Sequence, residues 1–492
     1  MQFLSTRGQD IAKNASFAIA EGLASDGGLF VPEKFPDFSE KLKTMLDMDY
    51  ADRAALVISS YLDEYDKDEL LSACKKAYAK FEDEEPAPVV KIDDNLFILE
   101  LFHGPTLAFK DVALTILPFL LRKGADQSGI REEILVLVAT SGDTGKAALE
   151  GFKDADGIKI CVFYPTGGVS DMQKRQMCTQ EGGNVNVVGV NGNFDDCQTA
   201  VKKIFSDKRI NAELKEKGIV LSSANSINFG RLVPQIAYYF SAYLDLVGSE
   251  EIKLGDKIDF VVPTGNFGNI LAGYYAKKMG LPIGKLICAS NQNNVLTEFF
   301  ESGTYNKNRE FFKTVSPSMD ILVSSNLERL IFELTGRNAE LTREKMESLS
   351  KKGEYDISKT ELSAIQKAFS AGFTEEEECL EEIKEFFDDF GYVLDTHTAV
   401  AMNVYDSLGD KNKPTVVLST ANFYKFPQSV LKAITGKNVT DAFKASEMLL
   451  KETAADIPFG ISELKNKTVR FTETVEKDKV YDAVKRFIET ER

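Results

Sequence analysis

Seven short apolar runs, separated by segments of helix length, constrain the fold of this chain more than any other feature. They are Ile134–Thr140, Ile158–Tyr164, Val185–Val190, Ile219–Ala224, Ile258–Pro263, Lys285–Ser290 and Thr415–Thr420. Several of them are apolar throughout and rich in Val and Ile, as expected of strands buried on both faces. Their alternation with amphipathic segments predicts an α/β fold in which parallel or mixed sheets are covered by helices.

The length of 492 residues exceeds what one hydrophobic core usually organises, so we expect two or three domains. Residues 1–86 have a mostly helical pattern and end in an acidic, proline-containing stretch that is typical of a linker. Residues 90–435 carry all seven apolar runs, and we predict an α/β region of two subdomains with a helical insertion at about 301–390. Residues 436–492 are interpreted as a C-terminal closing segment.

Composition excludes several classes of function. The formal net charge is -17, which disfavours a nucleic-acid partner because a negative surface repels a polyanion. No apolar run approaches the roughly 20 residues that span a bilayer, so no membrane partner is expected. The only histidines are His103 and His397, and the six cysteines contain no CxxC pair, so we expect no metal site. Dispersed cysteines and the lack of a secretory signal pattern predict a cytoplasmic protein.

Lys110 is the first candidate for chemistry. It follows the apolar run Leu107–Phe109 and precedes a helix-like segment that starts at Val112. Poor solvation and a helix N-terminus both lower a lysine pKa, which favours the neutral amine that forms imines. The alternative is a helix-start lysine whose stem lies along apolar surface and whose ammonium pairs with Asp111. This segment alone leaves both interpretations open.

The glycine-containing stretch Pro263–Asn269, PTGNFGN, follows one of the apolar runs and precedes a helix-like segment. Glycines let successive backbone amides turn toward one point, and a helix N-terminus adds positive potential there. The stretch predicts a phosphate site, with an ordinary glycine-rich turn as the alternative. It is not a dinucleotide fingerprint, because Phe267 stands where that motif requires its second glycine.

The stretch Ala139–Ala148, ATSGDTGKAA, lacks both the glycine spacing of a Walker loop and the Ser or Thr that binds magnesium there. Ser141, Thr144 and the amides around Gly142 instead predict a cradle for a small anion, for which a carboxylate is the natural guest. The alternative is an ordinary helix start in which Asp143 complements the helix dipole.

The stretch Ser222–Arg231, SSANSINFGR, also follows a strand-like run. Asn225, Ser226 and Arg231 offer neutral donors and one fork-shaped cation, which suits a second phosphate. A surface loop with a helix cap and an exposed arginine is the alternative. Taken together, one lysine, two phosphate-type cradles and one carboxylate cradle fit a phosphorylated amino acid on pyridoxal phosphate (PLP).

These motifs, in this order, closely resemble those of the threonine synthase family, in the longer form found in many bacteria and fungi. The segments Ser5–Gly8 and Ser16–Pro32 look like that family's N-terminal signature, and Ser419–Phe426, STANFYKF, matches a late motif. The similarity covers essentially the whole chain. It implies a fold-type II PLP enzyme, similar to tryptophan synthase β, with an added mostly helical N-terminal domain.

The resemblance also implies the site residues. Lys110 would carry PLP as an imine, and Thr420 would face the pyridine nitrogen of the cofactor. The cofactor phosphate would lie among the residues of the glycine loop: Gly265, Asn266, Phe267, Gly268 and Asn269. The substrate carboxylate would lie on Ser141, Gly142, Asp143 and Thr144, and the substrate phosphate on Asn225, Ser226 and Arg231. Some relatives carry Asp in place of Asn269, which leaves that contact open. For His103, beside Gly104, a structural role is favoured over the alternative that it lines the site.

The implied reaction converts O-phospho-L-homoserine and water into L-threonine and phosphate, with Lys110 as the group that moves protons. One alternative is a phospholyase or dehydratase of the same fold, and a phospholyase would release ammonia and a keto acid. A more distant alternative is a non-catalytic protein that binds a small anion or PLP. We expect a small-molecule substrate and a monomer or small homo-oligomer.

Overall fold

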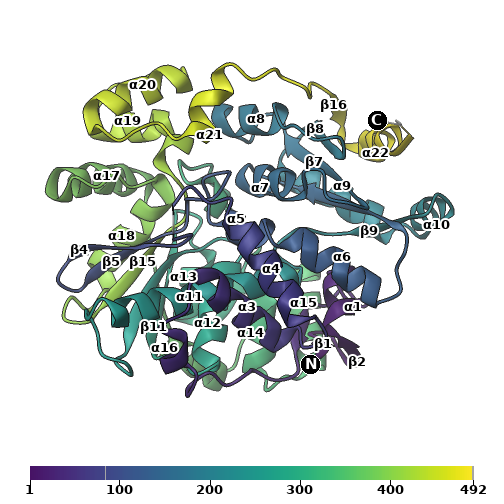
Figure 1. The fold of residues 1–492 in the computed structure, drawn as a ribbon, viewed down its shortest axis with the longest axis horizontal. Helices are drawn as coiled ribbons and strands as arrows, with labels where there is room; N and C mark the ends of the chain where they lie inside the picture. The colour runs from purple at the N-terminus through teal and green to yellow at the C-terminus, as the bar shows by residue number, and fades with distance from the viewer. Residues whose placement is uncertain (84, 490–492) are drawn as a thin grey trace.

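The computed structural model describes residues 1–83 and 85–489, and it contains two large β-sheets that lie one above the other in Figure 1. In the larger sheet the strand order is β14-β11-β10-β15-β5-β4, and neighbouring strands are parallel except for β4 and β5. Its strands are β4 (Val89–Asp93), β5 (Leu96–Glu100), β10 (Ile258–Pro263), β11 (Ile283–Ser290), β14 (Phe369–Phe373) and β15 (Thr415–Ser419). Parallel neighbours need crossover connections, and the helices that supply them cover the sheet.

The smaller sheet is parallel throughout, in the order β16-β8-β7-β6-β9. Its strands are β6 (Glu133–Ala139), β7 (Ile158–Pro165), β8 (Val185–Asn191), β9 (Ile219–Ser222) and β16 (Thr474–Glu476). All seven apolar runs singled out in the sequence form strands of these two sheets. The predicted α/β fold with two sheets covered by helices is therefore confirmed.

Helices surround both sheets. They are α5 (Lys110–Leu114), α6 (Leu117–Gln127), α7 (Asp143–Phe152), α8 (Asp171–Cys178), α9 (Phe194–Ser206), α10 (Lys208–Glu216), α11 (Phe229–Gly248), α12 (Gly268–Lys278), α13 (Val295–Ser302), α18 (Thr396–Leu408) and α19 (Pro427–Thr435). The helix α11 is mostly apolar and is buried along most of its length, as expected of a helix at the centre of a core. Of the helices in the described ranges, none has the length and apolar character needed to cross a bilayer.

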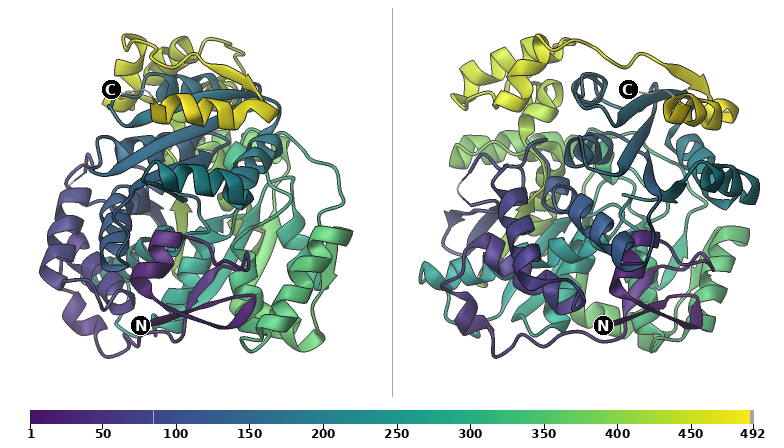
Figure 2. Two further views of the ribbon diagram at one scale, coloured as in Figure 1. Left: turned by 90° about the vertical axis from the view of Figure 1, so that its right-hand side faces the viewer. Right: turned by 45° about the vertical axis from the view of Figure 1, so that its right-hand side comes forward.

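The N-terminal segment combines a small antiparallel sheet with helices. Its elements are β1 (Gln2–Ser5), β2 (Gly8–Asn14), α1 (Ala15–Glu21), β3 (Phe30–Pro32), α2 (Leu42–Met45), α3 (Tyr50–Tyr61) and α4 (Lys67–Tyr78). Helix α3 packs against α11, and α1 packs against α6. Figure 2 shows the purple N-terminal strands beside the green helices of the later insertion.

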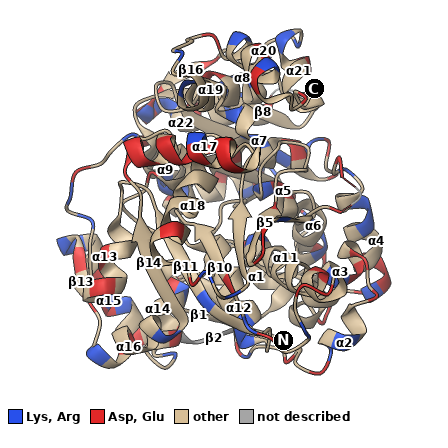
Figure 3. Ribbon diagram, turned by 90° about the vertical axis from the view of Figure 1, so that its left-hand side faces the viewer, with Lys and Arg blue, Asp and Glu red and all other residues tan. Residues whose placement is uncertain are grey.

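The region 301–390, interpreted from sequence as a helical insertion, also contains strands. It holds β12 (Thr304–Asn306), α14 (Leu327–Leu334), α15 (Ala339–Lys352), β13 (Glu354–Asp356), α16 (Lys359–Ala368), β14 and α17 (Glu376–Phe390). Strand β14, FSAGF, extends the larger sheet at its edge, where only part of a strand is buried. Its sequence therefore lacks the continuous apolar run that marked the inner strands. The acidic helix expected there is α17, the red helix on the surface in Figure 3.

The C-terminal tail closes the smaller sheet. It contains α20 (Ala442–Thr453), α21 (Phe459–Ser462), β16 and α22 (Val480–Glu489). Strand β16 pairs with β8, and α22 packs against α9, so the yellow tail lies over the blue strands in Figure 2. The most apolar face of α22 thereby covers Val188 and its neighbours in the sheet.

The carboxyl ends of the strands carry the motifs from which the sequence analysis selected site residues. Lys110 follows β5, the SGDT turn follows β6, Asn225 to Arg231 follow β9, the glycine loop follows β10, and Thr420 follows β15. Since ligands of parallel α/β sheets bind beyond the carboxyl ends of strands, this arrangement brings the motifs together.

Candidate active site

Lys110 lies where loops from the two sheets meet. It is the first residue of α5, its side chain is 11% exposed, and its Nζ lies 3.5 Å from Asp143 Oδ2 and 3.4 Å from Ser318 Oγ. The preceding residue, Phe109, donates its backbone N–H to the carbonyl oxygen of Thr420 at 2.9 Å. Lys110, the SGDT turn and Thr420 therefore lie close together, as expected for motifs of one site.

The environment of Lys110 lowers the pKa of its amine. Burial is the largest cause, and the positive charges of Lys425 and Arg231 act in the same direction, while Asp143 opposes them. A lysine whose pKa is lowered holds the neutral amine at a larger fraction, which is the form that acts as nucleophile or base. The pairing with Asp111 that was the alternative is not formed, because the Asp111 carboxylate instead accepts from Thr106 N at 2.8 Å and Thr106 Oγ1 at 2.6 Å.

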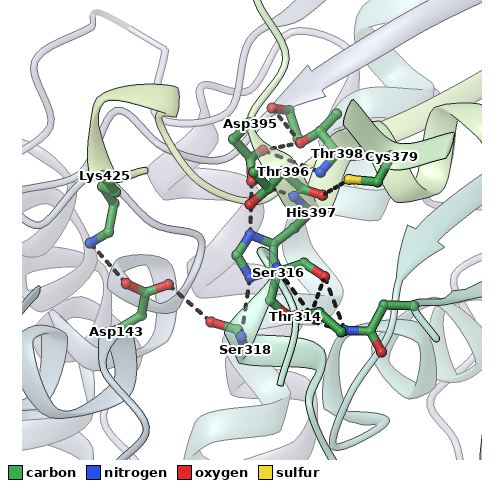
Figure 4. A network of polar contacts seen from close by, with 12 residues as sticks. Asp143, Thr314, Ser316, Ser318, Cys379, Asp395, Thr396, His397, Thr398 and Lys425 are labelled. Carbon is green, nitrogen blue, oxygen red and sulfur yellow. Dashed lines mark hydrogen bonds and ion pairs between the residues drawn. The ribbon is translucent and has the colours of Figure 1, made fainter. Parts of the chain in front are cut away.

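Asp143 belongs to a buried polar network, in which it contacts Lys425 and Ser318 (Figure 4). Its Oδ1 lies 3.1 Å from the Nζ of Lys425, which is fully buried, and accepts from Gln173 Nε2 at 2.9 Å. Burial alone would raise the pKa of Asp143, but Lys425, Lys110 and His397 together lower it below its usual value. The side chain therefore stays anionic and faces two lysines. An anion can instead be bound at this turn by the N-terminus of α7 and by the half-buried Ser141 and Thr144.

Ser318, Lys425 and His397 were not selected from the sequence. Ser318 lies in the 3-10 turn Pro317–Met319 and donates its hydroxyl to Asp143 Oδ2 at 3.2 Å. Its backbone N–H, and not its hydroxyl, bonds His397 Nε2 at 3.2 Å, while His397 Nδ1 lies 2.9 Å from Asp395 Oδ1. A Ser-His-Asp hydrolytic triad needs the hydroxyl on the imidazole, so this trio is a support for the loop. Of these three residues, only Lys425 could have been selected from the sequence, because it lies within the motif STANFYKF.

The glycine loop has a backbone that its neighbours fix. A Cβ added at Gly265 would lie 2.7 Å from the carbonyl oxygen of Ser318, so only glycine fits there. Phe267 has a left-handed φ of 62°, and its ring is held between those of Phe300 and Phe369. Asn326 donates both its backbone N–H and its Nδ2 to the Asn266 carbonyl oxygen, at 3.1 and 3.0 Å. Helix α12 begins at Gly268, so its N-terminus ends the loop.

Three buried polar atoms of the predicted phosphate loops have no hydrogen-bond partner within the described ranges: Asn225 Oδ1, Arg231 Nε and Asn269 Nδ2. Arg231 is 2% exposed, and no carboxylate of the described residues forms an ion pair with it. Burial lowers its pKa to about 10 against the charge of Asp111. Arg231 Nε and Asn269 Nδ2 are donors, and because an unpaired buried donor or cation is costly, these two atoms suit a bound anion, whereas Asn225 Oδ1 is an acceptor.

Asn269 differs from the Asp of some relatives in a way that the structure makes concrete. Its Oδ1 accepts from Tyr238 OH at 2.5 Å and from Tyr239 OH at 3.0 Å. This leaves Nδ2 as a donor without a partner among the described residues. A donor next to the glycine loop complements a phosphate, whereas a carboxylate there would repel one.

The residues present fit PLP. The phosphate of that cofactor needs a turn of backbone amides at a helix N-terminus, and the loop 263–269 ending in α12 supplies one. Its aldehyde needs a lysine with a lowered pKa, which Lys110 provides. The second predicted phosphate site, the loop 225–231, lies beside the glycine loop. A Cβ added at Gly268 would be 3.9 Å from Ser226 Cβ. His103, by contrast, lies 2.7 Å from Glu100 Oε2, which fits the structural role expected for it.

Three family models match the chain: "Threonine synthase N terminus" at residues 2–78, "Pyridoxal-phosphate dependent enzyme" at 82–420 and "Threonine synthase, C-terminal" at 398–488. The chain is 43% identical over 451 residues to threonine synthase-like 1 of Homo sapiens, covering 89% of this chain and 60% of that protein. It thus spans about 60% of the length of the threonine synthase-like 1 relatives.

Two further relatives align with this chain over nearly the full length of both proteins. The chain is 38% identical to threonine synthase of Pseudomonas aeruginosa, over 91% of this chain and 94% of that protein. The crystal structure of PLP-bound threonine synthase from Brucella melitensis superposes with a TM-score of 0.88 at 38% identity, covering 100% of both chains.

Proposed function

Because this chain belongs to the threonine synthase family of PLP-dependent enzymes, we propose that it converts O-phospho-L-homoserine and water into L-threonine and phosphate. The family and its cofactor, both predicted from the motifs, are confirmed by the family models and relatives. One observation carries the choice of substrate: the lysine with a lowered pKa is within electrostatic reach of Arg231, a buried cation that has no anionic partner in the described ranges. An amino acid that bears a phosphate supplies that partner.

The loop 225–231 is proposed to hold the substrate phosphate. Arg231 has its Nη1 committed to the carbonyl oxygen of Ala224 at 2.6 Å, which fixes the guanidinium and leaves Nε without a protein partner. Asn225 and Ser226 lie on the same loop, and the N-cap residue Asn228 fixes its end by accepting from Gly230 N at 2.8 Å. A charged donor and neutral donors then share the load of a dianion.

The turn after β6 is proposed to hold the substrate carboxylate. Thr140 Oγ1 accepts from Gly142 N at 3.0 Å and from Gly145 N at 2.8 Å, which shapes the turn. Ser141 and Thr144 remain half-buried at the start of α7, where the helix dipole favours an anion. The Asp143 side chain is proposed to act on Lys110 and not on the substrate carboxylate, since two carboxylates would repel each other.

Lys110 is proposed to move the protons. When bound, PLP supplies an electron sink for the bond that is broken at the substrate Cα. Lys110 Nζ takes the proton from Cα, and the same group is proposed to serve the later transfers at Cβ and Cγ. Burial and two cations favour its neutral form, while the ionised Asp143 stabilises it once protonated. This balance lets one amine both accept and return protons.

The proposal is tested by product analysis on purified, PLP-loaded protein. With O-phospho-L-homoserine we expect threonine and inorganic phosphate in equal amounts, and with unphosphorylated homoserine neither product. Ammonia and a keto acid in place of threonine would instead assign a phospholyase. A cytoplasmic location stays a proposal, which the six free, buried cysteines support because they suit a reducing compartment.

A further inference from the structure

Arg329, in the first turn of α14, is a fully buried arginine that no motif of the sequence had indicated. Its guanidinium donates to three parts of the chain. Nε donates to the Phe30 carbonyl oxygen at 3.0 Å, Nη2 to the Ile227 carbonyl oxygen at 2.6 Å, and Nη1 to Asn326 Oδ1. These acceptors belong to the N-terminal segment, the loop 225–231 and the segment beside the glycine loop.

Asn326 extends this connection into the glycine loop. While its Oδ1 accepts from Arg329, its backbone N–H and Nδ2 both donate to the Asn266 carbonyl oxygen. One guanidinium therefore sets the distance between the two loops that we expect to bind phosphate groups. Because its fork is planar and rigid, arginine can fix several acceptors at once, which lysine cannot.

The charge of Arg329 has no direct ion-pair partner in the described ranges, and the adjacent Glu328 attracts it only at longer range. Across residues 1–83 and 85–489 no carboxylate forms an ion pair with it, and its three hydrogen-bond partners are neutral. The adjacent Glu328 is instead taken up by Arg7, with Nη2 to Oε2 at 2.6 Å and Nε to Oε1 at 2.8 Å, and by the hydroxyl of Thr6. A buried, unpaired cation next to both loops raises their affinity for anions.

The N-terminal segment supplies the fixed points of this arrangement. Thr6 and Arg7 of the STRG signature hold Glu328, and Phe30 of the second signature holds Arg329. Helix α1 also contacts the loop 225–231, because the Ile19 carbonyl oxygen accepts from Asn228 Nδ2 at 3.0 Å. The N-terminal domain thus lies directly behind the loop 222–231.

We propose that Arg329 is a positioning residue for phosphate recognition, which holds the loop 225–231 and the glycine loop at a fixed spacing against Phe30 of the N-terminal domain. Its charge adds to the anion affinity of both loops. The inference rests on the proposed function, since it assigns Arg329 to the binding of the phosphorylated substrate. It also predicts that phosphate recognition requires the N-terminal segment, although no residue of that segment was selected as a ligand.

The test compares Arg329→Gln with Arg329→Lys and Asn326→Ala in the full-length, PLP-loaded protein. For Arg329→Gln we expect the KM for O-phospho-L-homoserine and the inhibition constant of inorganic phosphate to rise at least about 10-fold, with kcat changed less than about threefold. Arg329→Lys retains the charge and should recover part of the phosphate affinity. Asn326→Ala should raise both constants, because it removes the side-chain bond to Asn266 and the acceptor of Arg329 Nη1, while it leaves the cation and the backbone bond to Asn266 in place.

Arg53→Gln is the matched control. Arg53 is also buried, and it binds Asp245 and the Met45 carbonyl oxygen away from both loops. Its loss should lower the melting temperature and leave KM and phosphate inhibition unchanged. Inorganic phosphate binding is also measured by calorimetry, which needs no turnover. If the wild type makes no threonine, the proposed function fails, while the calorimetric comparison still decides the role of Arg329.

Unchanged phosphate affinity in both Arg329→Gln and Asn326→Ala would overturn the inference. Should Arg329→Gln not fold, the two milder variants carry the decision by themselves. A fall in kcat with KM and phosphate affinity intact would also count against it, since that pattern marks an effect on the chemistry and not on phosphate recognition.

Discussion

Lys110 Nζ and Asp143 Oδ2 lie 3.5 Å apart, and the same carboxylate is 3.1 Å from the fully buried Lys425. Asp143 is thus shared between two lysines. Lys425 is fixed by a second contact, since its Nζ also donates to the Thr106 carbonyl oxygen at 2.6 Å. The sharing leaves Lys110 only partly neutralised. Its amine can therefore exchange protons, while Lys425 keeps the carboxylate in place when Lys110 is uncharged.

Replacement of Lys110 by Ala should abolish threonine formation, by at least about 1,000-fold, because the nucleophile and the base are one group. The protein should stay folded, since the change removes a buried amine that only Asp143 and Ser318 contact with polar atoms. Circular dichroism and product analysis check both points. Lys277→Ala, a half-buried lysine at the far end of α12, should leave turnover intact. Threonine formation by the Lys110 variant would defeat the assignment.

The pKa of Lys110 can be followed without turnover. In cofactor-free protein, the pH dependence of Lys110 acetylation, measured by mass spectrometry, should show a half-point below that of exposed lysines, because burial lowers its pKa. In Asp143→Asn the half-point should fall further, because Asp143 is the charge that raises it. A half-point that rises in this variant would show that the carboxylate does not act on the amine.

The same variant predicts a pH dependence of stability. The folded state lowers the pKa of Asp143, so its ionised form contributes stability that is complete above the unfolded value of about 3.8 and is lost as the pH falls below it. At neutral pH, Asp143→Asn should cost about 3–5 kcal/mol, because Lys425 loses its buried partner. The difference from wild type should shrink as the pH is lowered toward 3. Denaturant unfolding at several pH values measures this, and a constant difference would contradict it.

Arg231→Gln should separate binding from stability. We expect the KM for O-phospho-L-homoserine to rise about 10- to 100-fold, the size of one charged hydrogen bond. The ligand-free protein should lose less than about 1 kcal/mol of unfolding free energy, because the removed cation has an unpaired Nε and no ion pair within the described residues. Arg209→Gln, on an exposed arginine, is the control for both measurements. Equal kinetics in the two variants would remove Arg231 from the site.

Gly265→Ala should weaken cofactor binding. The added Cβ would lie 2.7 Å from the Ser318 carbonyl oxygen, so the glycine loop or the turn that carries Ser318 must move. Titration with PLP, followed by its absorbance, should show at least about 10-fold weaker binding, since the backbone N–H groups of the loop no longer point at the phosphate. Gly248→Ala, where an added Cβ meets nothing within 4 Å, should bind PLP as the wild type does. Equal affinities would mean that the loop adapts at no cost.

The sequence revealed the strands and the glycine-rich turns because both depend on neighbouring residues. An apolar run such as Ile258–Pro263 carries its burial in its own composition, and the turn that follows carries its glycines. Strand β5, LFILE, was missed although it lies between β15 and β4 in the larger sheet and leads to Lys110. It is too short to stand apart from the surrounding charged residues. Strand β14 was missed because an edge strand buries too little to need a continuous apolar run.

By itself, the sequence determined seven strands of the two large sheets, which turns carry glycine and donors, and that Lys110 precedes a helix. Only the tertiary structure decided which charges face one another. Thr6 and Glu328 are 322 positions apart, yet they form one bond behind the phosphate loops, and Lys425 and Asp143 meet in the same way. The physical reason is that propensity acts between near neighbours, whereas burial and Coulomb interactions depend on distance in space, which only the folded chain sets.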